Sequence, residues 1–147
     1  MEIDWLSAEL LTEGRLIFDT AALVLIWLVQ RVIYPVFLYA RTEDFRVWHP
    51  VYTRRVTYVV MPIMLGQVGV YALAILTDPG IDVVANTFLI AAAWAITFFG
   101  AVPLHAALDG EATDHRALST KLININWWRT GTWTLIWSIT VINILVP

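Results

Sequence analysis

The chain has 147 residues, of which 59% are hydrophobic and 14% are charged, and its net charge is −3. A soluble domain of this size carries about 25% charged residues, so the composition excludes an ordinary soluble protein. The negative charge argues against nucleic-acid binding, and the absence of cysteine excludes disulfides, thiolate nucleophiles and cysteine-ligated metals.

Residues 1–15 are acidic where a secretory signal peptide would be positively charged. Apolar residues recur within this segment at helical spacing. The pattern predicts a short helix lying on the membrane surface, and a frayed acidic tail is the alternative.

Four long apolar runs follow, each long enough to cross a hydrocarbon core, which takes about 20 helical residues. They predict transmembrane helices over about residues 16–39, 50–76, 83–108 and 122–146. The connections are too short for a soluble domain, so we expect residues 1–147 to form a single integral membrane domain. Short connections favour antiparallel neighbours, which predicts an all-α, up-and-down bundle of four transmembrane helices.

Positive charge is concentrated in the first and third predicted loops. Eight of the nine arginine and lysine residues lie in or beside these loops, and only Arg15 lies near the N-terminus. Because cationic loops remain in the cytoplasm, we expect both termini on the outer, periplasmic side of a bacterial inner membrane.

The second predicted helix opens with the sequence HPVYTRR. Pro50 is tolerated in a first helical turn, so the helix should begin near His49. Tyr52 follows His49 by three residues and Arg55 follows Tyr52 by three, so the three side chains form one stripe along the helix.

Small and polar residues further along this helix predict the face that meets its neighbours. Gly66 and Gly69 would let another helix approach closely. Gln67 falls near the middle of the bilayer and should face protein rather than lipid.

Polar side chains near the cytoplasmic ends of the helices should gather at one level. His105 and Asp109 share a helix face, and Asn126 and Arg129 lie in the first turns of the fourth helix. An arginine at the membrane centre costs about 2.5 to 3.5 kcal/mol, so Arg129 should reach the interface or pair inside, with Asp109 as the expected partner. The outer half is nearly all aliphatic and aromatic, apart from Asp19, Asn86 and Thr87 near its edge, so any site should open to the cytoplasm.

Several motifs occur together in one order: WLVQRVIYPVF, HPVYTRR with PIML, PLHAAL, and NWWRTGTW. Over about residues 20–137 the chain thereby resembles a group of small bacterial four-helix membrane proteins of unassigned function. The resemblance implies a four-helix membrane bundle. It also implies a haem or metal cluster with a histidine in place of Ile33 and a glutamate in place of Gln67.

Eight residues match the pattern of that group: His49, Tyr52, Arg55, His105, Asn126, Trp127, Arg129 and Trp133. Ile33 and Gln67 depart from it, because isoleucine cannot ligate and glutamine supplies no charge to a divalent ion. The resemblance therefore implies a scaffold that has kept its fold and lost half of its site.

Two functions fit these observations. The depleted cluster and the many tryptophans favour a non-catalytic accessory or structural subunit of a larger photosynthetic or respiratory inner-membrane complex. Its partners would be lipids and other membrane subunits, pigment-bearing ones included, and it would need no metal and no other cofactor. A transporter or channel is the least favoured class, because the outer half lacks a polar path and no inverted repeat is present.

The alternative is a haem- or metal-binding membrane oxidoreductase with a site in the cytoplasmic third of the bundle. Its cofactor-binding residues would be His49, His105, Tyr52, Arg55, Asn126 and Arg129. Interfacial anchoring and core hydrogen bonds explain the same side chains without any ligand.

Overall fold

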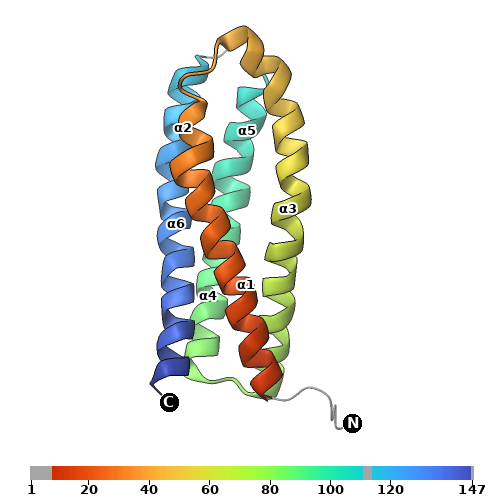
Figure 1. The fold of residues 1–147 in the computed structure, drawn as a ribbon, viewed down its shortest axis with the longest axis vertical. Coiled ribbons are helices and arrows are strands. Elements are labelled where there is room, and N and C mark those ends of the chain that lie inside the picture. Colours follow the sequence, from red (N-terminus) through yellow and green to blue (C-terminus); the bar gives the residue numbers. More distant parts are fainter. Residues whose placement is uncertain (1–7, 111–113, 147) are drawn as a thin grey trace.

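A computed structural model describes residues 8–110 and 114–146. Within these ranges every regular element is helical, and the helices join into four rods (Figure 1). The rods are α1 (Ala8–Leu28) with η1 (Val29–Ile33) and α2 (Tyr34–Val36); α3 (Thr42–Thr77); α4 (Ile81–Ile96) with η2 (Thr97–Ala101) and α5 (Val102–Leu108); and α6 (His115–Leu145). The predicted all-α fold is confirmed.

Successive rods run in opposite directions along the bundle (Figure 1). One end, here called the terminal end, holds the start of α1, the end of α6 and the α3–α4 connection. The opposite end, the loop end, holds the α2–α3 and α5–α6 connections. This is the up-and-down order expected from the short connections.

The rods extend beyond the predicted apolar runs. Residues 8–15 continue α1, although they were expected to lie on the membrane surface; residues 1–7 of that segment are outside the described residues. α3 begins at Thr42, so Pro50 lies inside the helix instead of in its first turn. The predicted helices ended where charged residues begin. A helix can continue through charged residues where its turns are exposed outside the hydrocarbon, so these rods are longer than predicted.

α6 also begins earlier than predicted, at His115, because Asp114 caps it. The Asp114 carboxylate accepts hydrogen bonds from the backbone N–H groups of Arg116 (3.1 Å) and Ala117 (3.2 Å). An aspartate at this position satisfies backbone donors that have no partner within the helix.

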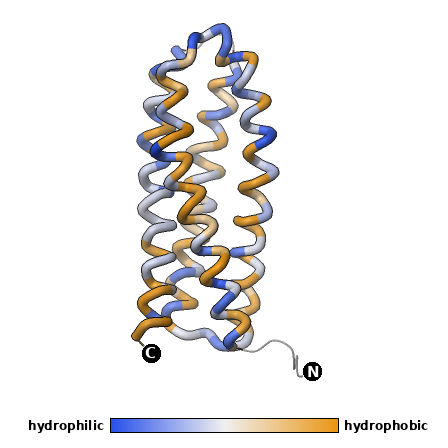
Figure 2. The backbone as a smooth tube through the Cα atoms, viewed as in Figure 1, coloured by the Kyte–Doolittle hydropathy of each residue, from blue (hydrophilic) through white to orange (hydrophobic). Residues whose placement is uncertain are grey.

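Among the described residues, three rods are long and apolar enough to cross a membrane: Ala8–Val36, Thr42–Thr77 and Ile81–Leu108. α6 is not one of them, since asparagine, threonine and arginine residues interrupt its apolar sequence. Figure 2 shows long hydrophobic stretches along the rods, with hydrophilic segments toward both ends of the bundle. These features are those of a membrane protein.

The rods form a ring in which α1 packs against α3 and α6, and α4 and α5 pack against α6. Gly66 allows α1 and α3 to approach, because a Cβ atom there would overlap the ring of Phe18. A Cβ atom at Gly69 would meet no described atom within 4 Å. The predicted close approach is therefore right for Gly66 and wrong for Gly69. α3 makes few contacts with α5.

Two rods contain a π-helical turn, η1 and η2, and each turn is soon followed by a proline, Pro35 and Pro103 respectively. Proline cannot donate a helical hydrogen bond, and a π turn accommodates the interruption with an extra residue. The extra residue rotates the segment that follows. Tyr34 and His105, in the segments after these turns, meet across the bundle.

Candidate functional site

Four side chains at the loop end form a chain of hydrogen bonds, here called the Asp109–Tyr34 chain. Asp109 Oδ1 lies 2.7 Å from His49 Nδ1, and His49 Nε2 lies 3.0 Å from His105 Nδ1. His105 Nε2 lies 2.9 Å from the Tyr34 hydroxyl. One set of neutral tautomers satisfies all three contacts, because Tyr34 O–H, His105 Nδ1–H and His49 Nδ1–H can each donate toward the Asp109 carboxylate.

This chain runs from the surface into an aromatic interior. The Asp109 side chain is 39% exposed, whereas His49 is fully buried. Phe45 stacks on the His49 ring with the centroids 4.7 Å apart, and Phe37 meets the same ring edge-on at 5.4 Å. The aromatic rings shield the buried part of the chain from water.

Arg129 is a buried cation next to the inner end of the chain, and it interacts with Tyr34. The residue is only 7% exposed. Its Nη1 donates to Asn126 Oδ1 at 2.8 Å, and its guanidinium carbon lies 5.3 Å from the centre of the Trp133 ring. Nε has no hydrogen-bond partner among the described residues.

The predicted pairing of Arg129 with Asp109 is wrong. Asp109 instead bonds to His49, and no carboxylate among the described residues forms an ion pair with Arg129. Asn126 offers Arg129 only a neutral oxygen, Oδ1. The Nδ2 group of Asn126 donates a hydrogen bond to Gln30 Oε1 at 2.7 Å. Arg129 is therefore a buried positive charge that these residues leave unbalanced.

A cleft of about 280 Å³ opens beside Arg129, where α3 and α5 make few contacts. Its polar lining consists of Tyr34, Tyr52, Thr57, Thr97, His105 and Arg129. The rest of the lining is apolar and comes mainly from α3 and the third rod: Val29, Val56, Val60, Met61, Met64, Trp94, Phe98, Ala101 and Val102. The cleft therefore combines one charged, hydrogen-bonding region with a hydrocarbon-like wall.

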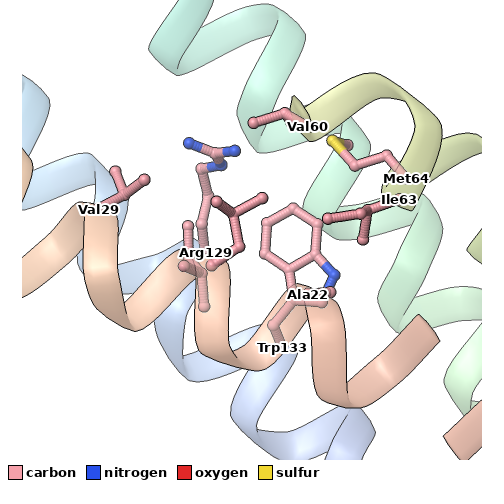
Figure 3. A pocket seen from close by; sticks show the side chains of 9 residues that line it. Ala22, Val29, Val60, Ile63, Met64, Arg129 and Trp133 are labelled. Atoms are coloured by element: carbon pink, nitrogen blue, oxygen red, sulfur yellow. The ribbon is translucent and has the colours of Figure 1, made fainter. Parts of the chain in front are cut away.

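A much smaller apolar pocket, of about 30 Å³, is also lined by Arg129 and shares Val29, Val60 and Met64 with the cleft. Figure 3 shows the Arg129 guanidinium group among Val29, Val60 and the Trp133 ring. No acidic residue is among the nine that line this pocket. Its volume suits at most a water molecule, so the larger cleft is the candidate ligand site.

Five of the six predicted site residues come together at this level of the bundle. Tyr52, His105 and Arg129 line the cleft. His49 is hydrogen-bonded to His105, and Asn126 accepts a hydrogen bond from Arg129. Arg55 is exposed and does not line the cleft. Tyr34 was not among the predicted site residues. The sequence feature that could have indicated it is Pro35, because a proline at that point predicts an interruption of the helix beside Tyr34.

The pair His49 and His105 does not fit the axial ligation of a haem. All four imidazole nitrogens are engaged, with each other, with Asp109 and with Tyr34. A metal held between two imidazoles would need the nitrogens about 4 Å apart, since each metal–nitrogen bond is about 2 Å. The facing nitrogens here are 3.0 Å apart.

A second buried network lies toward the terminal end, where an aliphatic and aromatic interior was predicted. The fully buried Asp19 carboxylate accepts hydrogen bonds from Gln67 Nε2 (2.7 Å), Tyr71 (2.8 Å) and Thr140 (2.7 Å). Asn86 Nδ2 donates to both Tyr71 and Thr140 at 2.9 Å. Asp19 and Asn86, expected as separate polar residues near the edge of an otherwise apolar outer half, instead join in a buried network.

The charges of this second network include an ion pair. Arg15 binds Asp82, and its guanidinium carbon lies 5.3 Å from the centre of the Tyr71 ring. Gln67 faces protein, as predicted, and its oxygen accepts a hydrogen bond from Trp133 Nε1 at 3.1 Å. Trp133 thus lies between the two networks.

No family model, curated protein or solved structure matches this chain. Its function has to be inferred from the site.

Proposed function

We propose that this chain is a multi-pass protein of the bacterial inner membrane that binds an acidic amphiphile in the cleft beside Arg129. In this proposal α6 is a fourth span and both termini are periplasmic, as the positive-inside rule predicts. The observation that carries the proposal is the buried charge of Arg129, which faces an apolar cleft and has no acidic partner among the described residues.

A buried charge without a partner is unfavourable by several kcal/mol, and an anionic group in the cleft would offset much of that. Arg129 Nε has no partner among the described residues and can donate to such a group. Tyr52 lines the same cleft, and its hydroxyl can donate as well. The polar lining therefore suits a compact acidic head.

The apolar lining suits a hydrocarbon chain attached to that head. A volume of about 280 Å³ holds the head and the first part of a chain, and the remainder would extend into lipid. A fatty-acid carboxylate and a lipid phosphate share this chemistry. In the proposed orientation the loop end is cytoplasmic, so a head beside Tyr34 and His105 would lie near the cytoplasmic leaflet.

Quenching of tryptophan fluorescence tests this proposal. The protein is placed in nanodiscs of neutral lipid and titrated with a brominated long-chain fatty acid, a brominated phosphatidic acid, or the methyl ester of the same fatty acid. Trp94 lines the cleft, so the signal lost in Trp94→Phe reports binding there. We expect saturable quenching by at least one acid and none by the ester, and the two acids distinguish a free carboxylate from a lipid phosphate.

Substitution of the arginine completes the test. Arg129→Gln should weaken binding at least about tenfold, because the charge that meets the acidic head is lost. Arg129→Lys keeps the charge and should retain part of the affinity. Arg55→Gln removes an exposed arginine outside the cleft and is the matched control. Equal binding of the ester, or full affinity in Arg129→Gln, would refute the proposal.

The accessory-subunit role is the second proposal, and the outer face of α6 favours it. A groove of about 350 Å³ between α1 and α6 exposes Trp27 and Trp127 beside Gly131 and Leu135. α6 is less apolar than the other rods, so an apolar transmembrane helix of another subunit would cover this face. Purification from native membranes in mild detergent tests it; recovery of the chain alone, at the mass of a monomer, contradicts it.

A further inference from the structure

We infer that the Asp109–Tyr34 chain carries a proton between water at the loop end and the ligand head in the cleft. The inference rests on the proposed function, because the bound acid is the group that exchanges a proton with Tyr34. Beyond ligand binding, it assigns a route by which the proton of the bound acid exchanges with water at the loop end.

The chain has the two properties that proton transfer requires. Its three contacts are 2.7, 3.0 and 2.9 Å long, so each proton has only a hydrogen bond to cross. Its ends lie in different environments: the Asp109 side chain is 39% exposed, whereas Tyr34 and His105 line the cleft. Every member can both give and accept a proton.

The transfer is balanced in protons and charge. A neutral acid in the cleft passes its proton to the Tyr34 oxygen, while Tyr34 passes its own proton to His105 Nε2. His105 passes its Nδ1 proton to His49 Nε2, and His49 passes its Nδ1 proton to Asp109, which exchanges it with water. The acid remains as an anion beside the Arg129 cation. The reverse transfer protonates the anion, restores both imidazole tautomers, and allows the neutral acid to leave.

The other ionisable groups around the chain do not extend it to the terminal end. Tyr52 and Arg129 lie at its inner end. His115 lies at its outer end, where its ring stacks on Phe45 with centroids 5.2 Å apart. Beyond Arg129 the path meets the indole of Trp133 and the amide of Gln67, and an indole N–H is a donor only. Proton exchange is therefore confined to the loop end.

Stopped-flow mixing of the nanodisc-embedded protein with the long-chain fatty acid, in weak buffer with a pH indicator, measures the rate of proton release. Empty nanodiscs provide the background. Asp109→Asn should slow the release at least about tenfold, since the terminal acceptor is lost. Its affinity in the quenching titration should stay unchanged, because Asp109 does not line the cleft.

Two further measurements separate a relay from a structural role. Asp109→Glu should restore the rate, and adding imidazole to Asp109→Asn should restore it in proportion to imidazole concentration, which no purely structural defect would do. Asp44→Asn, which changes an exposed acid at the same end, should release protons at the wild-type rate. His49→Phe keeps an aromatic ring between Phe37 and Phe45 and should be as slow as Asp109→Asn, with no imidazole response.

The outcomes distinguish the two proposals. If the wild-type protein shows no saturable quenching by the acids, the proposed function fails, and the relay fails with it. If binding is normal and Asp109→Asn releases protons at the wild-type rate, the relay alone is overturned. A slow release that imidazole does not restore also overturns it.

Discussion

The buried arginines of the two networks differ in whether a carboxylate pairs with them. At the terminal end, Asp19 accepts three hydrogen bonds, and Arg15 is paired with Asp82. At the loop end, Arg129 is almost as deeply buried, yet no described carboxylate pairs with it and a cleft opens beside it. Burial of a charge therefore does not mark a ligand site by itself. A network whose arginine has a carboxylate partner, here called balanced, joins helices, whereas one whose arginine has none among the described residues, here called unbalanced, leaves room for an anion.

The largest effect should come from breaking the balanced network. Asp19→Ala leaves the donors of Gln67, Tyr71 and Thr140 without their common acceptor and should lower the free energy of unfolding by about 2 to 4 kcal/mol. Denaturation by SDS in mixed micelles measures it. Asp19→Asn keeps an acceptor and should lose less; equal stability of Asp19→Ala and wild type would remove the structural role.

A smaller loss should follow from separating the helices that bring Gln67 to Asp19. Gly66→Ala places a methyl group against the Phe18 ring and should lower the unfolding free energy by about 1 to 2 kcal/mol, because the core must shift to admit it. Gly69→Ala, where the new methyl group meets no described atom, is the matched control. Alanine favours a helix more than glycine does, so Gly69→Ala should lose no stability. Equal losses in both variants would mean that the contact with Phe18 is not the cause.

The unbalanced network should respond in the opposite direction. Arg129→Met removes an unpaired buried cation while keeping much of its volume, and we expect a gain of about 1 kcal/mol in the free energy of unfolding. The same denaturation experiment, without added acid, measures it. A loss as large as that of Asp19→Ala would erase the contrast between the two networks and show that Arg129 is held by structural interactions alone.

The smallest effect on stability should come from the outer end of the Asp109–Tyr34 chain. Asp109→Asn changes a partly exposed group and should lower the unfolding free energy by less than about 1 kcal/mol. Thermal melts followed by circular dichroism would detect this as a shift of a few degrees at most. A large shift would place Asp109 with Asp19 among the residues on which the fold depends.

Much of the fold could be predicted because hydropathy and loop length determine it. The apolar runs located the rods, and the short connections indicated antiparallel order. The helix ends were harder to predict. A charged residue such as Arg15 or Glu43 indicates where an apolar run ends, but it does not indicate where the helical hydrogen bonds end. The π turns before Pro35 and Pro103 were beyond reach for a related reason: proline predicts an interruption without specifying its form.

The site could be predicted only at the level of its depth in the bundle. Alternating helices brought His49, His105 and Arg129 to one level, as expected. Partners across helices depend on rotation about each helix axis, and a rotation of one residue decides whether Asp109 meets Arg129 or His49. The Asp19 network was missed because its members are single polar residues on three different apolar rods and on α6, each unremarkable alone.

α6 supplies Arg129 and Asn126 to one network and Thr140 to the other, and its composition bears on how the protein reaches the membrane. A segment this polar would leave the insertion machinery poorly on its own, because each arginine or asparagine opposes partition into lipid. In the proposed four-span arrangement, the third rod would therefore have to remain at the lateral exit until α6 emerges, so that the last two rods enter the bilayer as a pair. A nascent chain truncated within α5 would already commit its earlier rods to lipid, whereas one lacking the third rod would leave α6 in water.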